Sequence, residues 1–160
     1  MPYYVRAFCT ASQSPTINAV MQSLRQCGPN CDACVDDVSE LDSPLWQQFE
    51  LIYKSGNGPI VVECNRDETP DSLAKAECEE FIEEVAELEA SPAKDKVMEH
   101  LRMTRFIVSC QLLSDCDDDG YEANGKLLDY FVEKCGGMIH ADGEGFYDRM
   151  NTDNVLLPLR

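Results

Sequence analysis

Basic side chains are scarce in this sequence. Its 160 residues include 13 Lys and Arg against 30 Asp and Glu, which gives a formal net charge of −17. A surface of this charge repels phosphate backbones and anionic lipid headgroups. We therefore expect no direct binding to nucleic acid or to membranes, and we expect a macromolecular partner, where there is one, to be basic.

Long apolar runs are missing as well. No stretch approaches the roughly 18 residues that a membrane-spanning helix needs. The first residues, MPYYVRAF, do not show the basic segment followed by an apolar segment that is typical of a signal peptide. We expect the protein to be cytoplasmic.

Cysteine is frequent, but its share stays below the 8–10% or so that marks disulfide scaffolds. The chain has nine cysteines, an odd number, and its 160 residues are enough to bury a core without cross-links. Reduced thiols fit this pattern best. We expect most of them to be buried, where cysteine behaves as a small apolar side chain.

Familiar catalytic motifs are absent. There is no G-x-S-x-G, no P-loop and no G-x-G-x-x-G, and the chain has only two histidines, His100 and His140. We expect His100 to face the solvent from a short helix. His140 is followed closely by Asp142 and Glu144, a group able to bind a metal or to transfer protons. An enzyme with an unrecognised Cys or His site is the weakest of three interpretations of the whole chain.

Apolar periodicity predicts a single α+β domain over residues 1–160. Alternation of side chains indicates strands, and apolar residues three and four apart indicate helices. Ser14-Pro15 is predicted to cap the first helix, and residues 28–44 are predicted to form a long loop. The predicted elements are a strand at 3–9, a helix at 15–27, a hairpin at 46–65, helices at 70–88 and from 92, a strand at 106–113, a helix at 121–135, a hairpin at 138–147 and a short strand near 154–158.

The order β-α-β-β-α-β of the first major elements is that of the split βαβ core of ferredoxin-like folds. We predict such a core, extended by a C-terminal helix and short strands, with a right-handed last crossover. Residues 44–54 allow two interpretations, because Ser43-Pro44 also suits the start of a helix. The hairpin is preferred, since the strand Ile60–Val62 needs a neighbour.

The sharpest local pattern is C-x3-C-x2-C, formed by Cys27, Cys31 and Cys34. A structural zinc site would use these three thiolates and a fourth ligand from elsewhere in the chain. Redox chemistry is disfavoured, because a helix C-terminus at Cys27 and several nearby acids oppose a thiolate. The preferred interpretation is a loop with one or two buried thiols.

Calcium is suggested by Asp115, Asp117 and Asp119, which precede Gly120 in a D-x-D-x-D-G pattern. Carboxylates at alternate positions converge on one centre in an EF-hand loop. The twelfth position, however, is Lys126 where a bidentate Glu is required. The same acids also suit the cap of the following helix, and this interpretation is preferred.

Acidic residues are densest between positions 63 and 95, where 12 acids stand against 3 basic residues, a net charge of −9. One face of the helix predicted there is acidic, opposite its apolar stripe. This face is either a solvated surface that favours solubility or a docking site for a basic protein. Our expectation is a non-catalytic binding or regulatory module, with metal binding as the alternative. The four residues of the acidic face are Glu77, Glu80, Glu84 and Glu87.

Overall fold

The computed structural model describes residues 3–28, 30–67, 72–148 and 154–159. Within these ranges the chain forms eight strands, four α-helices and one 3-10 helix at Val38–Asp42. The strands are β1 (Tyr3–Cys9), β2 (Asp32–Cys34), β3 (Gln48–Ile52), β4 (Ile60–Arg66), β5 (Phe106–Leu112), β6 (Gly137–Ala141), β7 (Gly145–Tyr147) and β8 (Leu157–Pro158). The helices are α1 (Ile17–Gln26), α2 (Leu73–Ala86), α3 (Pro92–Met103) and α4 (Asp118–Cys135).

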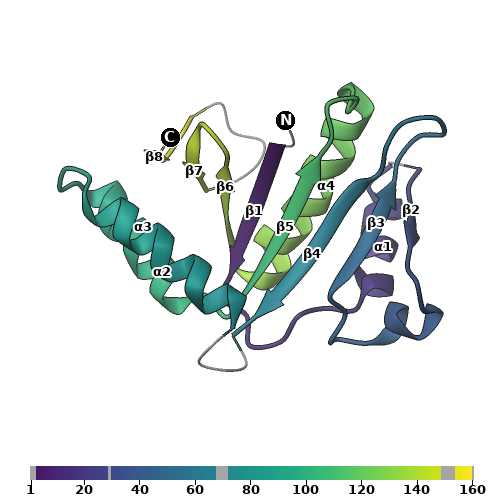
Figure 1. The fold of residues 1–160 in the computed structure, drawn as a ribbon, viewed down its shortest axis with the longest axis horizontal. Helices are drawn as coiled ribbons and strands as arrows, with labels where there is room; N and C mark the ends of the chain where they lie inside the picture. Colours follow the sequence, from purple (N-terminus) through teal and green to yellow (C-terminus); the bar gives the residue numbers. More distant parts are fainter. Residues whose placement is uncertain (1–2, 29, 68–71, 149–153, 160) are drawn as a thin grey trace.

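All eight strands belong to one sheet, in the order β2-β3-β4-β5-β1-β6-β7-β8, and every neighbouring pair is antiparallel (Figure 1). The predicted α+β class and both predicted hairpins are confirmed. β5 and β6 run parallel to each other on either side of β1, and α4 connects them. None of the described helices combines the length and the apolar composition needed to cross a bilayer.

The two faces of the sheet support two separate cores. On β1, the side chains of Val5 and Ala7 pack with α1 and α4, whereas Phe8 points the other way and packs with α2 and α3. The second core covers only the half of the sheet around β1, β6, β7 and β8, and Figure 1 shows no helix in front of β3 and β4. Glu50 and Glu63 are therefore exposed on that face.

The specific ferredoxin-like arrangement is not confirmed. β5 lies between β4 and β1, so that β1 and β4 are not neighbours. The four helices are also divided between the two faces of the sheet. The connection from β4 to β5 contains both α2 and α3, and this helical pair brings the chain back beside β4 in the antiparallel direction.

The predicted N-cap of the first helix is wrong by two residues. Thr16 caps α1, and its hydroxyl accepts a hydrogen bond from the Ala19 amide at 3.1 Å. Ser14 is instead buried, because its hydroxyl donates to the Pro44 carbonyl at 2.7 Å and accepts from the Arg66 guanidinium at 2.9 Å. The apolar stripe predicted for this helix is confirmed, and all its members are buried: Ile17, Val20, Met21 and Leu24.

Further boundaries differ from the prediction. The segment 28–44 is not wholly a loop, because Asp32–Cys34 pairs with β3 and Val38–Asp42 forms a 3-10 turn. The helical interpretation of residues 44–54 is wrong, since β3 pairs with β4. α4 begins at Asp118, one residue after its cap, three residues earlier than predicted. The predicted helix start at Thr69-Pro70 lies outside the described residues, and α2 follows a cap at Ser72.

Candidate functional site

A cleft of about 610 Å³ lies between α2 and the half-covered face of the sheet. It is lined from four directions: by α2, by the central strands, by the turn after β6 and by the C-terminal segment. Four carboxylates and one guanidinium line it, so its described ionised groups carry a net negative charge. The lining residues with polar or aromatic side chains are Arg6, Asn65, Glu77, Glu80, Phe81, Glu84, His140 and Asp142.

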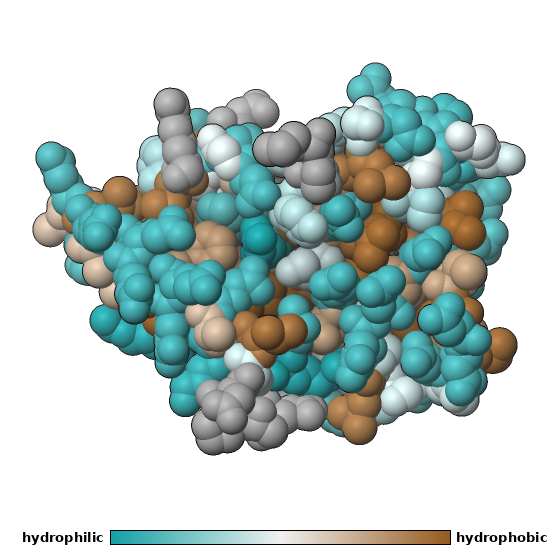
Figure 2. Space-filling view, in the orientation of Figure 1, coloured by the Kyte–Doolittle hydropathy of each residue, from teal (hydrophilic) through white to brown (hydrophobic). Residues whose placement is uncertain are grey.

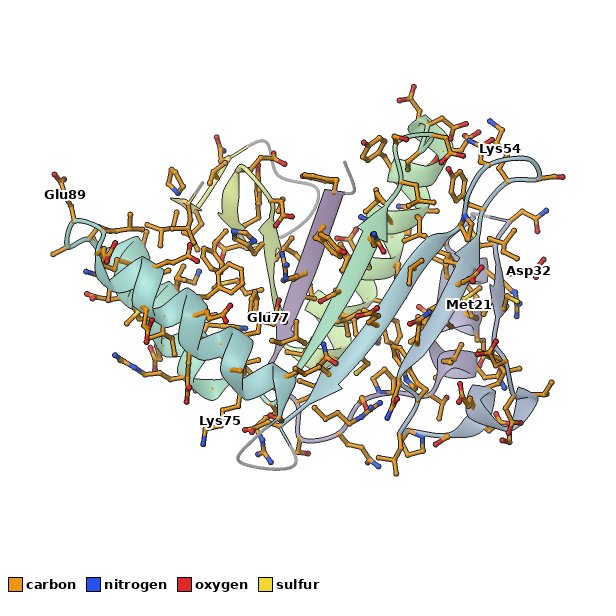
Figure 3. All side chains as sticks on the ribbon, viewed as in Figure 1. Met21, Asp32, Lys54, Lys75, Glu77 and Glu89 are labelled. Carbon is orange, nitrogen blue, oxygen red and sulfur yellow. The ribbon has the colours of Figure 1, made fainter. Side chains whose placement is uncertain are left out.

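The carboxylates of α2 reach this cleft because of helical spacing. Glu77, Glu80 and Glu84 are three and four residues apart, so they share one face of the helix. Ala74, Cys78 and Val85 lie on the neighbouring buried face and hold the helix against its core. Figure 3 shows Glu77 on the side of α2 that faces β1, whereas Lys75 points away from the sheet.

Arg6 lines the cleft and pairs with two of its four carboxylates. Its guanidinium donates to Asp142 at 2.8 Å and forms a short hydrogen-bonded ion pair with Glu77. The guanidinium carbon also lies 5.4 Å from the ring centroid of Tyr4 and 5.6 Å from that of Phe81. This arrangement combines two carboxylates with two aromatic faces around one cation.

His140 lies at the inner end of the cleft and is only 4% exposed. Its ring is held between Phe81 and Phe146, with centroid separations of 4.7 and 4.8 Å. Neither ring nitrogen makes a hydrogen bond of normal geometry to the described residues. Unpartnered buried polar groups of this kind are rare in folded proteins.

The electrostatic surroundings keep His140 neutral. Burial is the largest effect and the nearby Arg6 guanidinium adds to it, so the pKa of His140 falls to about 4. Asp142, the backbone of Leu159 and Glu144 act in the opposite direction but do not compensate. At neutral pH the ring therefore carries one N–H donor and one acceptor nitrogen, and both atoms are buried where the residue lines the cleft.

The structure brings together three of the four predicted partner-binding glutamates. Glu77, Glu80 and Glu84 line the cleft, and Glu87 is exposed beyond it. Glu77 is half-buried and pairs with Arg6, so it does not belong to the solvated surface; partner binding by the four glutamates stays a prediction. Figure 2 shows mostly hydrophilic side chains over α2 and α3.

The group of His140, Asp142 and Glu144 is only partly assembled. The first two residues line the cleft. Glu144 instead accepts hydrogen bonds from the hydroxyls of Tyr3 and Tyr147. The prediction for His100 is wrong, because it is half-buried and its Nε2 lies 2.7 Å from the carbonyl of Phe8.

The three clustered cysteines lie in different settings. Cys27 is the exposed C-cap of α1, Cys31 is buried, and Cys34 is exposed on β2. Burial, with Asp32 nearby, raises the pKa of the Cys31 thiol, which opposes thiolate formation as expected from the sequence. Among the described residues, no three His, Cys, Asp or Glu side chains are grouped so as to hold a metal ion. Zinc binding stays a prediction.

The carboxylates considered as calcium ligands, those of Asp115, Asp117 and Asp119, connect the β3–β4 hairpin to the start of α4. The Lys54 ammonium donates to Asp117 at 2.8 Å and to Asp119 at 2.9 Å, and the Gly58 amide donates to Asp115 at 2.7 Å. Figure 3 shows Lys54 at the tip of this hairpin, beside the start of α4. Asp117 caps α4, which confirms the capping interpretation. Calcium binding likewise stays a prediction.

Two important cleft residues were not singled out from the sequence. Arg6 is the only basic residue on β1, and an aromatic residue lies two positions before it (Tyr4) and two positions after it (Phe8). This pattern could have identified Arg6 from the sequence. Phe81 belongs to the apolar stripe of α2, but its side chain is half-buried and also lines the cleft. Comparison with protein-family models, with curated proteins and with solved structures found no match to this chain.

Proposed function

We propose that this protein is a non-catalytic binding module that holds a basic segment of a partner protein in the cleft between α2 and the sheet. The observation that carries the proposal is the row Glu77, Glu80 and Glu84, which lines the cleft together with Asp142. One guanidinium, that of Arg6, balances only part of this charge. A basic side chain entering the cleft gains attraction from several carboxylates at once.

The composition of the whole chain also favours a basic partner. With a net charge of −17, the protein attracts cationic surfaces over distances of about a Debye length and so speeds their association. The cleft also provides a concave site with aromatic and apolar walls, which a negative charge spread over the surface does not provide. Pockets of a few hundred cubic ångströms are of the size that encloses one or two side chains or a small ligand.

The location of the protein is part of the proposal. We place it in the cytoplasm, because the structure shows no disulfide bond among the nine cysteines, all of which lie in its described part, and six of them are buried, which suits a reducing compartment. Burial raises the pKa of the Cys9, Cys78 and Cys135 thiols, to about 12 for Cys78 and about 11 for Cys135. These thiols therefore behave as apolar packing groups and not as reactive centres.

The proposal is tested by neutralising the cleft carboxylates. We expect the double variant Glu80→Gln/Glu84→Gln to bind a short fluorescent lysine- and arginine-rich peptide about tenfold more weakly than the wild type, because two attractive charge contacts are lost. Binding should also weaken as salt rises from about 50 to about 300 mM. Fluorescence anisotropy at equilibrium measures both effects.

The matched control lies on the same helix. Glu79 and Glu83 are exposed and do not line the cleft, so Glu79→Gln/Glu83→Gln changes the net charge equally without touching the site. Its affinity should stay within about twofold of the wild type. Equal losses in the two double variants would contradict the proposal, since they would show that only the overall charge matters.

A further inference from the structure

The inner end of the cleft differs chemically from its acidic rim. We propose that it binds the guanidinium of an arginine side chain of the partner, with the acceptor nitrogen of His140 and the carboxylate of Glu80 as its ligands. This inference rests on the proposed function and names the side chain that the cleft selects. Its basis is a buried imidazole that has no hydrogen-bond partner among the described residues and lies at the end of an acidic cleft.

The state of His140 determines what kind of group is able to pair with it. In the neutral ring one nitrogen carries the N–H, and neither nitrogen has a hydrogen-bond partner among the described residues. The other nitrogen of the neutral ring is an acceptor. A ligand that donates a hydrogen bond to it removes the cost of burying an unpaired acceptor.

A guanidinium meets the other demands of the site better than an ammonium does. Its planar face packs on aromatic rings, and its several N–H groups allow it to reach an imidazole nitrogen and a carboxylate together. Phe81, which contacts His140, provides the aromatic wall. Glu80 provides a carboxylate on the cleft face of α2.

The protein already holds one guanidinium in this way. Arg6 pairs with Glu77 and Asp142 while its guanidinium carbon lies 5.6 Å from the Phe81 ring centroid. The same cleft therefore accommodates a planar cation between carboxylates and an aromatic ring. Because Arg6 occupies Glu77 and Asp142, the carboxylates of Glu80 and Glu84 are those left to receive a second cation; neither forms an ion pair among the described residues.

The experiment uses three short peptides that share flanking lysines and differ only at the central position, which is arginine, lysine or citrulline. Citrulline keeps the shape of arginine without its charge. We expect the arginine peptide to bind about tenfold more tightly than the citrulline peptide, and the lysine peptide to fall between them. In a His140→Phe variant the preference for arginine over lysine should disappear, while the binding due to the flanking lysines and to the attraction of Glu80 remains.

A second measurement leaves the protein unaltered. Since the chain has two histidines, long-range ¹H–¹⁵N spectra of the wild type report on both imidazoles. Adding the arginine peptide should shift the His140 nitrogens, whereas His100, which contacts the Phe8 carbonyl, should not respond. The citrulline peptide should leave both unchanged.

The outcomes separate this inference from the proposed function. If none of the three peptides binds, the proposed function itself fails. If all three bind equally and His140 does not shift, the basic-segment proposal stands and the arginine site is overturned. If free N-acetyl-arginine amide binds as tightly as the arginine peptide, the site takes a small guanidinium compound, which overturns the assignment to a partner side chain.

Discussion

Replacing Trp46 by alanine is expected to lower the free energy of unfolding by about 3–5 kcal/mol. Trp46 is 1% exposed, and its ring lies 5.3 Å from that of Phe49 in an edge-to-face contact. Its Nε1 donates to the Pro15 carbonyl at 2.7 Å, and the guanidinium carbon of Arg66 lies 5.8 Å from its ring centroid. Truncation therefore leaves a cavity and an unpaired carbonyl beside the start of α1.

Chemical denaturation followed by circular dichroism measures this effect, because the sole tryptophan is lost in the variant. The neighbouring Leu45 is 63% exposed, and Leu45→Ala serves as the control with an expected change within about 0.5 kcal/mol. A loss below about 1 kcal/mol in Trp46→Ala would show that the segment before β3 does not pack on the core as described.

The second large effect concerns Gly145, at the start of β7. Its φ is +137°, and a Cβ there would lie 2.3 Å from the Leu157 oxygen and 2.7 Å from the Pro158 Cα. Gly145→Ala is expected to cost at least about 2 kcal/mol, because backbone strain adds to a clash with a neighbouring strand. The variant should also bind basic peptide more weakly, since β8 is followed by Leu159, which lines the cleft.

Gly143 provides the matched control in the same hairpin. Its φ is +76°, but a Cβ there would meet nothing within 4 Å. Gly143→Ala should therefore lose only the strain of a left-handed alanine, about 1–2 kcal/mol. Thermal unfolding of the two variants compares them directly. If Gly145→Ala is no less stable than Gly143→Ala, the pairing of β7 with β8 is contradicted.

Local periodicity was sufficient to predict most elements of this fold. The alternating residues of β1, the apolar stripe of α1 and the Ser91 cap of α3 all follow from short stretches of sequence. β2 was not predicted, because a strand of three residues with alternate exposed side chains carries too little pattern. The strand order was not predictable either. It depends on which face of the sheet α2 and α3 pack against before the chain returns as β5 beside β4.

The candidate site shows the same division between local and long-range information. The shared face of Glu77, Glu80 and Glu84 follows from helical spacing alone. The pairing of Glu77 with Arg6 does not, because α2 and β1 are far apart in the chain and meet only in the folded protein. The isolation of His140 between Phe81 and Phe146 likewise depends on how α2 and β7 pack over β6.

The most direct test of the central claim is a map of where a basic peptide binds. Amide chemical shifts of the ¹⁵N-labelled wild type, followed during titration with the lysine- and arginine-rich peptide, give this map residue by residue. We predict the largest changes at Ala76, Glu80, Phe81, Glu84 and His140, which line the cleft. The largest changes at the outer face around Glu79 and Glu83, or at the acidic start of α4 around Asp118, would contradict the account.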